Sequence, residues 1–280
     1  MADYYDAHQH FHFEALASHR AAIDAELRSA GVRCAVVNAT GEDEWPVVAE
    51  LAGRFDWIRP SYGIHPWDCG NRSPGWQTAL RNRLVADPAA GVGEIGLDRW
   101  IIDGVRPDDP RLAGLRVAPM DEQSEVFAAQ LDLAAELNRA ASIHCTQAFG
   151  VLDEVIRSGR QPARGFLLHG YGGPAELVGP FADLGAYFSF NLEVMQPRLA
   201  ARRASFAAVP LDRLLVETDA PAKAPPAELN RFPLGESADG SPINHPGNIL
   251  AAYDALAELR GLPLEVLASQ VKTNFLRFFG

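Results

Sequence analysis

The sequence predicts an α/β protein folded as a (β/α)8 barrel of the TIM type, with residues 1–280 in a single domain. Eight short runs with the residue types of β-strands recur along the chain, and the stretches between them have helical periodicity. With 280 residues, 48% of them hydrophobic, the chain can bury one sizeable core. Alternating strands and helices predict a parallel sheet covered by helices. The pattern alone does not separate a closed barrel from an open sheet, but eight units favour closure.

The predicted strands follow one another at intervals that leave room for a helix between most of them. The segment Glu125–Leu137 illustrates such a helix, because Val126, Ala129, Leu133 and Leu137 lie near one helical face. The strands are, in order, Tyr4–His8, Cys34–Thr40, Ile58–His65, Gly91–Leu97, Ala141–Thr146, Gly165–Tyr171, Tyr187–Leu192 and Leu214–Thr218.

Two connections are longer than this pattern requires. Arg99–Pro119 follows the fourth predicted strand, and Ala220–Pro246 follows the eighth. Both should lie on the face of the barrel where the strands end, where a long loop usually shapes or covers an active site.

Composition and charge narrow the class of protein. The formal charge of −11 and the isoelectric point near 5.2 predict a field that repels polyanions, so contact with nucleic acid would need a local basic patch or bound cations. Three widely spaced cysteines, Cys34, Cys69 and Cys145, predict neither a disulfide framework nor a zinc ribbon.

No segment of the sequence has the pattern of a targeting or membrane-spanning element. The chain begins without a basic start or a signal-peptide apolar run, and no later segment approaches roughly 20 uninterrupted apolar residues. We therefore expect a cytoplasmic protein with no membrane contact and no obligatory protein partner.

The strongest local motif is Asp6-Ala7-His8-Gln9-His10, at the end of the first predicted strand. Strand periodicity sends His8 and His10 to the same side, and a backbone bend there would let both imidazoles reach one ion. The alternative is a polar strand end without chemistry.

Four further ionisable residues lie at or near the carboxyl ends of predicted apolar strands: Glu94, His144, His169 and Asp219. Burial of such a group is costly unless it is paired or bound to a metal. Because parallel strands end at one mouth, a shared cation site explains all six residues more economically than independent accidents. Imidazoles with carboxylates suit Zn²⁺, Mn²⁺ or Co²⁺, and the carboxylates leave Mg²⁺ open.

In this order the motifs resemble the TatD-type metal-dependent deoxyribonucleases, a family of the amidohydrolase-like barrel class. The resemblance extends from Asp6 to about Phe275. It rests mainly on the D-A-H-Q-H motif of residues 6–10, G-I-H-P of 63–66, G-E-I-G-L-D of 93–98, I-H-C of 143–145 and E-T-D-A-P of 217–221.

The resemblance implies a centre with two divalent metal ions. On the matching positions, His8, His10 and Asp219 hold one cation, His144 and His169 hold the other, and Glu94 bridges the pair.

The sequence departs from the family pattern where substrate contacts are expected. The family commonly has a second histidine at the position of Trp67 and an arginine at the position of Thr146, so two phosphate-contacting groups are missing. The loop Arg99–Met120 is longer than usual, and Ile243–Pro246 replaces an Arg-Asn-Glu-Pro sequence. These departures leave the metal ligands intact but weigh against DNA as the substrate.

The predicted mechanism uses water activated between two cations. Asp219 is the predicted general base, Glu94 is the predicted bridging carboxylate, and His65 would orient or protonate a substrate oxygen. Trp67 would stack on a base or line a wall. Arg99 and Lys223 would contact an anionic substrate or remain solvated charges. Three histidines are not needed by the site: His12 and His19 are read as structural or exposed, and His245 as an outside candidate for the pocket.

Three functions remain open from the sequence. The first is hydrolysis of phosphodiesters, with DNA or an oligonucleotide as substrate. The second keeps the metal pair but hydrolyses a small amide, ester or phosphoester. The third is a non-catalytic metal-binding barrel, against which the full set of six ligands argues.

Overall fold

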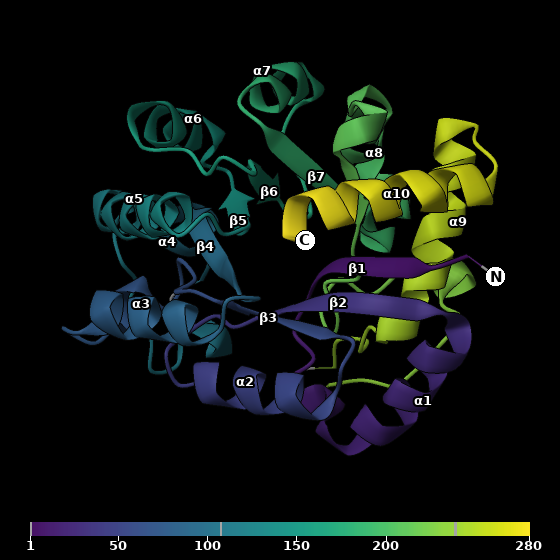
Figure 1. The fold of residues 1–280 in the computed structure, drawn as a ribbon, viewed down its shortest axis with the longest axis horizontal. Coiled ribbons are helices and arrows are strands. Elements are labelled where there is room, and N and C mark those ends of the chain that lie inside the picture. The colour runs from purple at the N-terminus through teal and green to yellow at the C-terminus, as the bar shows by residue number, and fades with distance from the viewer. Residues whose placement is uncertain (1, 107, 238–239) are drawn as a thin grey trace.

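The computed structural model describes residues 2–106, 108–237 and 240–280, which form one parallel sheet of eight strands in the order β1 to β8 (Figure 1). The interleaved helices and the nearly closed ring of strands confirm the predicted (β/α)8 architecture. The strands are β1 (Tyr4–Gln9), β2 (Val32–Asn38), β3 (Ile58–Tyr62), β4 (Gly91–Asp98), β5 (Ala141–Thr146), β6 (Phe166–Leu168), β7 (Ala186–Phe190) and β8 (Leu214–Val216).

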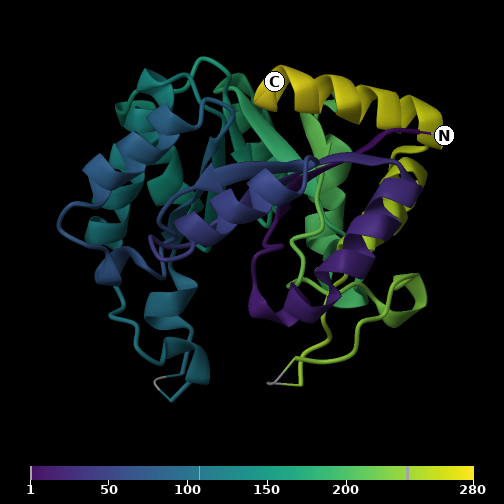
Figure 2. The same ribbon diagram turned by 60° about the horizontal axis from the view of Figure 1, so that its bottom comes forward.

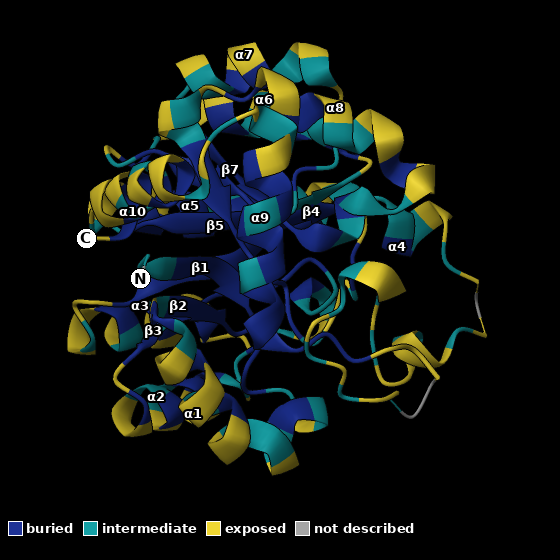
Figure 3. Ribbon diagram, turned by 90° about the vertical axis from the view of Figure 1, so that its right-hand side faces the viewer, coloured by how far each residue is buried: buried dark blue, intermediate teal, exposed yellow. Residues whose placement is uncertain are grey.

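Helices surround the ring of strands. In Figure 3 the strands are buried and the helices expose their outward faces. Within the described ranges, no helix is long and apolar enough to cross a membrane. The helices are α1 (Arg20–Ala30), α2 (Trp45–Arg54), α3 (Trp76–Ala86), α4 (Trp100–Asp103), α5 (Met120–Glu136), α6 (Phe149–Ser158), α7 (Val178–Asp183), α8 (Ala200–Ala208), α9 (Ile249–Arg260) and α10 (Leu264–Phe279).

Hydrogen bonds between β1 and the segment after β8 hold the first and last strands together. The Asp219 N–H donates to the His8 carbonyl oxygen at 2.9 Å, and the His10 N–H donates to the Ala220 carbonyl oxygen at 2.7 Å. The buried Asp6 carboxylate accepts the Thr218 hydroxyl proton at 2.6 Å. This seam lies at the carboxyl end of the barrel, so it also brings together ligand-bearing residues from the two ends of the chain.

Helix α5 fixes the ends of two strands through buried glutamines. The predicted apolar face is present, since Val126 and Leu133 are buried in the core. Gln130 on the same helix accepts the Ile64 N–H at 2.7 Å and donates to the Ile64 carbonyl at 3.1 Å. Gln123 likewise accepts the Asp98 N–H at 2.8 Å and donates to the Asp98 carbonyl oxygen at 3.2 Å. The helix therefore positions the backbone beside His65 and the end of β4.

Five predicted strands extend too far, because β2, β3, β6, β7 and β8 end two or three residues before the predicted bounds. His65, His169 and Asp219 therefore lie beyond the ends of β3, β6 and β8. Their N–H groups still bond to carbonyl oxygens in or just after the neighbouring strands. The distances are 2.7 Å from His65 to Thr40, 3.1 Å from His169 to Ile143 and 2.9 Å from Asp219 to His8. The three side chains are thus held by backbone bonds beyond the regular sheet.

Both long connections project from the same end of the barrel, as Figure 2 shows. The first contains α4 and a 3-10 turn at Pro110–Leu112, and the second contains a 3-10 turn at Ala227–Leu229 and a bridge between Glu236 and Pro242. The prediction that they share the face where the strands end is correct for the described residues; Pro107 in the first connection and residues 238 and 239 in the second lie outside them.

Candidate metal centre

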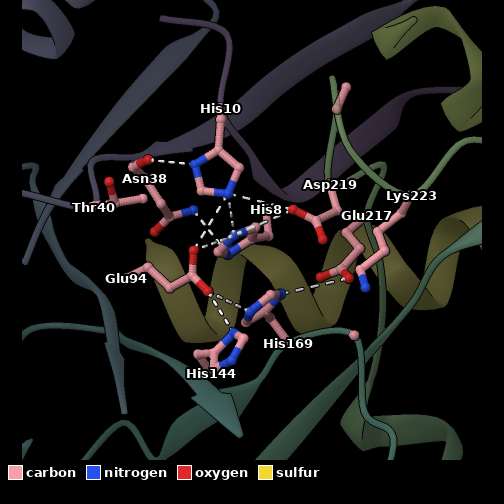
Figure 4. A network of polar contacts seen from close by, with 12 residues as sticks. His8, His10, Asn38, Thr40, Glu94, His144, His169, Glu217, Asp219 and Lys223 are labelled. Carbon is pink, nitrogen blue, oxygen red and sulfur yellow. Dashed lines mark hydrogen bonds and ion pairs between the residues drawn. The ribbon is translucent and has the colours of Figure 1, made fainter. Parts of the chain in front are cut away.

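Six side chains from the carboxyl ends of the strands point toward one another inside the barrel mouth (Figure 4). His144 is half-buried and the other five are buried. Register shifts interrupt the ladders of β1 between Asp6 and Gln9 and of β4 between Val92 and Ile95. This irregular backbone surrounds the ligand positions, in agreement with the bend predicted at the first motif. The six are the residues that the sequence predicts as ligands: His8, His10, Glu94, His144, His169 and Asp219.

The first ligand group consists of His8, His10 and Asp219 with the Oε2 atom of Glu94. The two Nε2 atoms of the histidines are 3.3 Å apart, and each is 3.3 Å from Glu94 Oε2. Asp219 Oδ1 lies 3.4 Å from His10 Nε2 and 3.8 Å from His8 Nε2. Ligand atoms about 2.0–2.1 Å from a tetrahedral ion stand about 3.3 Å apart, so this spacing fits a cation of the size of Zn²⁺.

The second ligand group consists of His144 and His169 with the other carboxylate oxygen of Glu94. His169 Nε2 lies 2.8 Å and His144 Nδ1 2.9 Å from Glu94 Oε1. The His169 ring also stacks on the His8 ring, with centroids 3.8 Å apart, so the two groups adjoin. Glu94 therefore presents one oxygen to each group, which is the arrangement of a bridging ligand.

The electrostatics of this cluster favour a bound cation. Burial raises the pKa of Glu94, but the positive charge of His169, His65 and His8 outweighs it and holds the pKa well below its usual value. Burial likewise opposes protonation of His10, yet its contacts with Asp219 and Glu94 raise its pKa to about 10. The carboxylates thus retain a positive partner, and a divalent cation can supply that charge in place of protons.

Hydrogen bonds to the outer ring nitrogens orient the histidines of the first group. His10 Nδ1 lies 2.8 Å from the Asn38 carbonyl oxygen, which can only accept, so the neutral ring keeps Nε2 free for a metal. His8 Nδ1 lies 2.9 Å from Ser142 Oγ. The buried Asn38 Oδ1 lacks a partner, while Asn38 Nδ2 faces His8 Nδ1 at 3.0 Å. A cation on His8 Nε2 leaves the proton on Nδ1. With the Asn38 amide turned over, Oδ1 would accept a hydrogen bond from this Nδ1–H and would no longer lack a partner.

Two carboxylates that the sequence analysis did not assign to the site lie beside the histidines of the second group. His144 Nε2 lies 3.0 Å from Asp98 Oδ2; burial raises the pKa of Asp98, but the contact with His144 outweighs it and lowers the pKa to about 2. The ring therefore donates through Nε2 and turns Nδ1 toward Glu94. Glu217 is fully buried, with its Oε1 3.7 Å from His169 Nδ1. Asp98 lies in the G-E-I-G-L-D motif and Glu217 in the E-T-D-A-P motif, so these motifs were the sequence feature that could have indicated both residues.

His65 has the hydrogen bonding of a donor rather than of a metal ligand. Its Nε2 lies 3.3 Å from Glu94 Oε1, and its Nδ1 accepts the Trp67 N–H at 3.2 Å. A neutral ring that accepts at Nδ1 carries its proton on Nε2. This favours the predicted role of orienting or protonating a substrate oxygen.

Replacing Ser142 by alanine should weaken metal binding by about 10- to 100-fold, because the His8 Nδ1–H loses one of the two side chains, Ser142 and Asn38, that orient the ring. Competition with a chelator of known affinity measures this loss. Ser158→Ala, which removes an exposed hydroxyl on α6, is the matched control. Equal affinities in the two variants would contradict the orienting role of Ser142.

Gly93 leaves no room for a side chain beside this hydrogen-bond network. A Cβ on Gly93 would lie 2.8 Å from both Asn38 Oδ1 and the Ser142 Cβ, and 2.9 Å from Ser61 Oγ. The glycine before Glu94 is thus required by the close packing of the residues that support His8.

The remaining predicted candidates lie outside the ligand cluster. Arg99 and Lys223 are partly exposed and face Asp103 at 3.7 Å and Glu193 at 3.6 Å. His245 accepts the Gly247 N–H at 2.8 Å and caps a 3-10 turn, so it is not part of the ligand cluster.

His12 and His19 match the structural alternative. His12 is buried, with Nε2 2.9 Å from Glu44 Oε2, and His19 is half-buried before α1.

An aromatic wall formed by Trp67 and Trp100 stands beside the second ligand group. The rings stack with centroids 5.9 Å apart, and the Trp67 indole N–H donates to Asp98 Oδ2 at 2.9 Å. Arg111, from the first long loop, lies over Trp100 at 4.8 Å. Thr146 Oγ1 lies 3.1 Å from His144 Nε2. Both positions that depart from the family pattern therefore serve internal contacts.

A cavity of about 630 Å³ lies where the two long connections approach each other. Arg111 of the first loop and Lys223 and Ile243 of the second line it, together with Glu193. Its volume falls within the usual range for small-molecule sites.

Residues 5–280 match the model of the TatD related DNase family. The 3'-5' ssDNA/RNA exonuclease TatD of Klebsiella pneumoniae is 27% identical over 257 residues, covering 91% of this chain and 90% of its own. YjjV of Escherichia coli K12, named an uncharacterized metal-dependent hydrolase, is 28% identical over 276 residues, or 98% and 96% of the two chains. The crystal structure of the E. coli YjjV protein superposes with a TM-score of 0.83 at 26% identity, covering 99% of this chain and 97% of that one.

Proposed function

Because this chain belongs to the TatD-related DNase family and so is a metal-dependent hydrolase, we propose that its centre holds two divalent cations and hydrolyses phosphodiester bonds. The first ligand group would hold one cation, the second would hold the other, and Glu94 would belong to both groups. The observation that carries this proposal is the division of the Glu94 carboxylate, whose Oε2 faces His8 and His10 while its Oε1 faces His144 and His169.

The bound cations would supply Lewis acidity that lowers the pKa of a water molecule and stabilises charge on the reacting oxygens. Asp219 accepts the proton of the attacking water. Burial raises the pKa of Asp219, but contacts with His10, His169 and His8 outweigh it and lower the pKa to about 2, so the carboxylate is ionised at neutral pH. His65 donates its Nε2 proton to a substrate oxygen.

The family and the nuclease among the relatives support an oligonucleotide as substrate. A small ester, amide or phosphoester is the second candidate. It is favoured by Trp67 and Thr146, which occupy the positions of the family's phosphate contacts. The net charge of −11 also favours a small substrate, because a negatively charged protein repels a polyanion. The imidazole and carboxylate ligands favour Zn²⁺, Mn²⁺ or Co²⁺, with Mg²⁺ as the alternative.

Hydrolysis by metal-stripped protein reloaded separately with each of these ions tests the proposal. The substrates are single-stranded DNA, single-stranded RNA, and small carboxylic esters and phosphodiesters. We expect no activity without metal, recovery with at least one ion, and loss in Asp219→Asn, which excludes contaminating nucleases. Activity on small substrates alone would replace the nuclease proposal by the second candidate. Metal binding without any hydrolysis would contradict both and leave a metal-binding barrel.

A further inference from the structure

A second pocket lies at the amino ends of the strands, on the side of the barrel opposite the metal centre. It has a volume of about 160 Å³ and is lined by Arg59 of β3, Arg139 just before β5 and Arg164 just before β6. Phe279 and Gly280, at the end of α10, complete one side. Figure 2 places this end of α10 away from the two long loops. The pocket is therefore separate from the metal centre and its mouth.

The three guanidinium groups have few protein partners. No aspartate or glutamate lines the described part of the pocket. The buried Nε–H groups of Arg139 and Arg164 have no hydrogen-bond partner. Each arginine donates one hydrogen bond to a main-chain oxygen: Arg59 to that of Ala89 at 2.8 Å, Arg139 to that of Leu84 at 3.0 Å, and Arg164 to that of Gly280. Since each group carries five N–H donors, most of the donors remain available to a ligand.

This concentration of positive charge contrasts with the rest of the molecule. The chain has a net charge of −11, and exposed arginines elsewhere pair with carboxylates, as Arg81 does with Glu136 and Arg157 with Asp153. In the pocket, burial and the neighbouring charges of Arg164 and Arg139 lower the pKa of Arg59, and they outweigh Cys34 and Asp87, which raise it. Three half-buried guanidinium groups that repel one another are stabilised by an anion between them, and their planar forks match oxyanions.

The size of the pocket limits what this anion can be. A volume of about 160 Å³ equals the space of roughly five water molecules. That accommodates a tetrahedral ion with its contacts but not a nucleotide. We propose that this pocket, the arginine pocket, binds a free inorganic oxyanion of the phosphate type through Arg59, Arg139 and Arg164. The bound ion connects the amino ends of β3, β5 and β6 and stabilises the barrel from the end opposite the metal centre.

Calorimetric titration of the metal-loaded protein with inorganic phosphate, at an ionic strength held constant with chloride, tests the proposal. The wild-type protein should bind one more phosphate per chain than Arg139→Gln. Arg157→Gln, which removes an exposed charge on α6, should behave as wild type. Inhibition of hydrolysis by phosphate reports the metal centre and should be the same in all three proteins. Equal phosphate stoichiometry and affinity in all three would overturn the proposal.

A second variant separates directed hydrogen bonds from net charge and keeps the test available if Arg139→Gln does not fold. Arg139→Lys retains the charge but loses the planar fork, so its phosphate affinity at the arginine pocket should fall by about tenfold. In melting experiments, phosphate at about a hundred times its dissociation constant should raise the Tm of the wild-type protein by about 4 °C more than that of Arg139→Gln. Wild-type affinity in the lysine variant together with no difference in Tm would contradict binding by the arginine forks.

Discussion

Replacing Glu94 by glutamine should lower hydrolysis by at least about a thousandfold, within the range for removal of an essential catalytic group, and should reduce the bound metal by at least half. The neutral amide has one oxygen and one NH₂ group. Whichever way it turns, the NH₂ group faces one of the two ligand groups, where Glu94 now presents oxygens 2.8 and 3.3 Å from the nearest histidine nitrogens. A cation on that side loses its shared ligand and meets a donor in its place.

Metal analysis of the purified variant, together with kcat on the best substrate, measures both effects. Glu136→Gln is a matched control, because Glu136 is an exposed carboxylate on α5 that pairs with Arg81. Full metal content in Glu94→Gln would show that Glu94 is not the bridging ligand, even if activity were lost.

Replacing Asp219 by asparagine should lower kcat by about 10²- to 10⁴-fold, the usual contribution of a general base. The substitution preserves the backbone, since Asp219 has a φ of 54° and asparagine tolerates this left-handed conformation well. The amide oxygen can still approach a cation, but the side chain can no longer accept the proton of water.

Kinetic constants and metal content of Asp219→Asn are compared with those of Asp219→Ala, which removes the ligand atom as well. We expect Asp219→Asn to retain more metal than Asp219→Ala while both lose activity. Wild-type kcat in Asp219→Asn with full metal content would exclude Asp219 as the base and move that role to another residue.

The (β/α)8 architecture could be predicted because each strand and helix can be recognised from a short stretch of neighbouring residues. Each strand is an apolar run of a few residues. An ionisable side chain within such a run, such as Glu94 or His144, is easily recognised as an exception. The ends of β3 and β8 were less predictable. Their sequences continue to look like strands, although β3 ends at Tyr62 and β8 at Val216.

The residues that support the ligands could not be assigned from the sequence. Asp98 acts through His144, and Ser142 acts through His8, a residue 134 positions away. Such partners are polar residues within strands, and nothing in their local sequence identifies the side chain that they will meet. The role of Trp67 depends likewise on its contacts with Asp98 and Trp100 from another part of the chain.

The contacts between β1 and the end of β8 join residues that the ribosome makes at very different times. Asp219 meets His8 and His10 only after nearly the whole chain has been made, and its main chain then bonds to β1. A chain still attached to the ribosome before that point holds part of the proposed ligand set but cannot complete the first ligand group. The first ligand group is therefore completed late in synthesis, and a polypeptide that terminates before Asp219 would lack one of its proposed members.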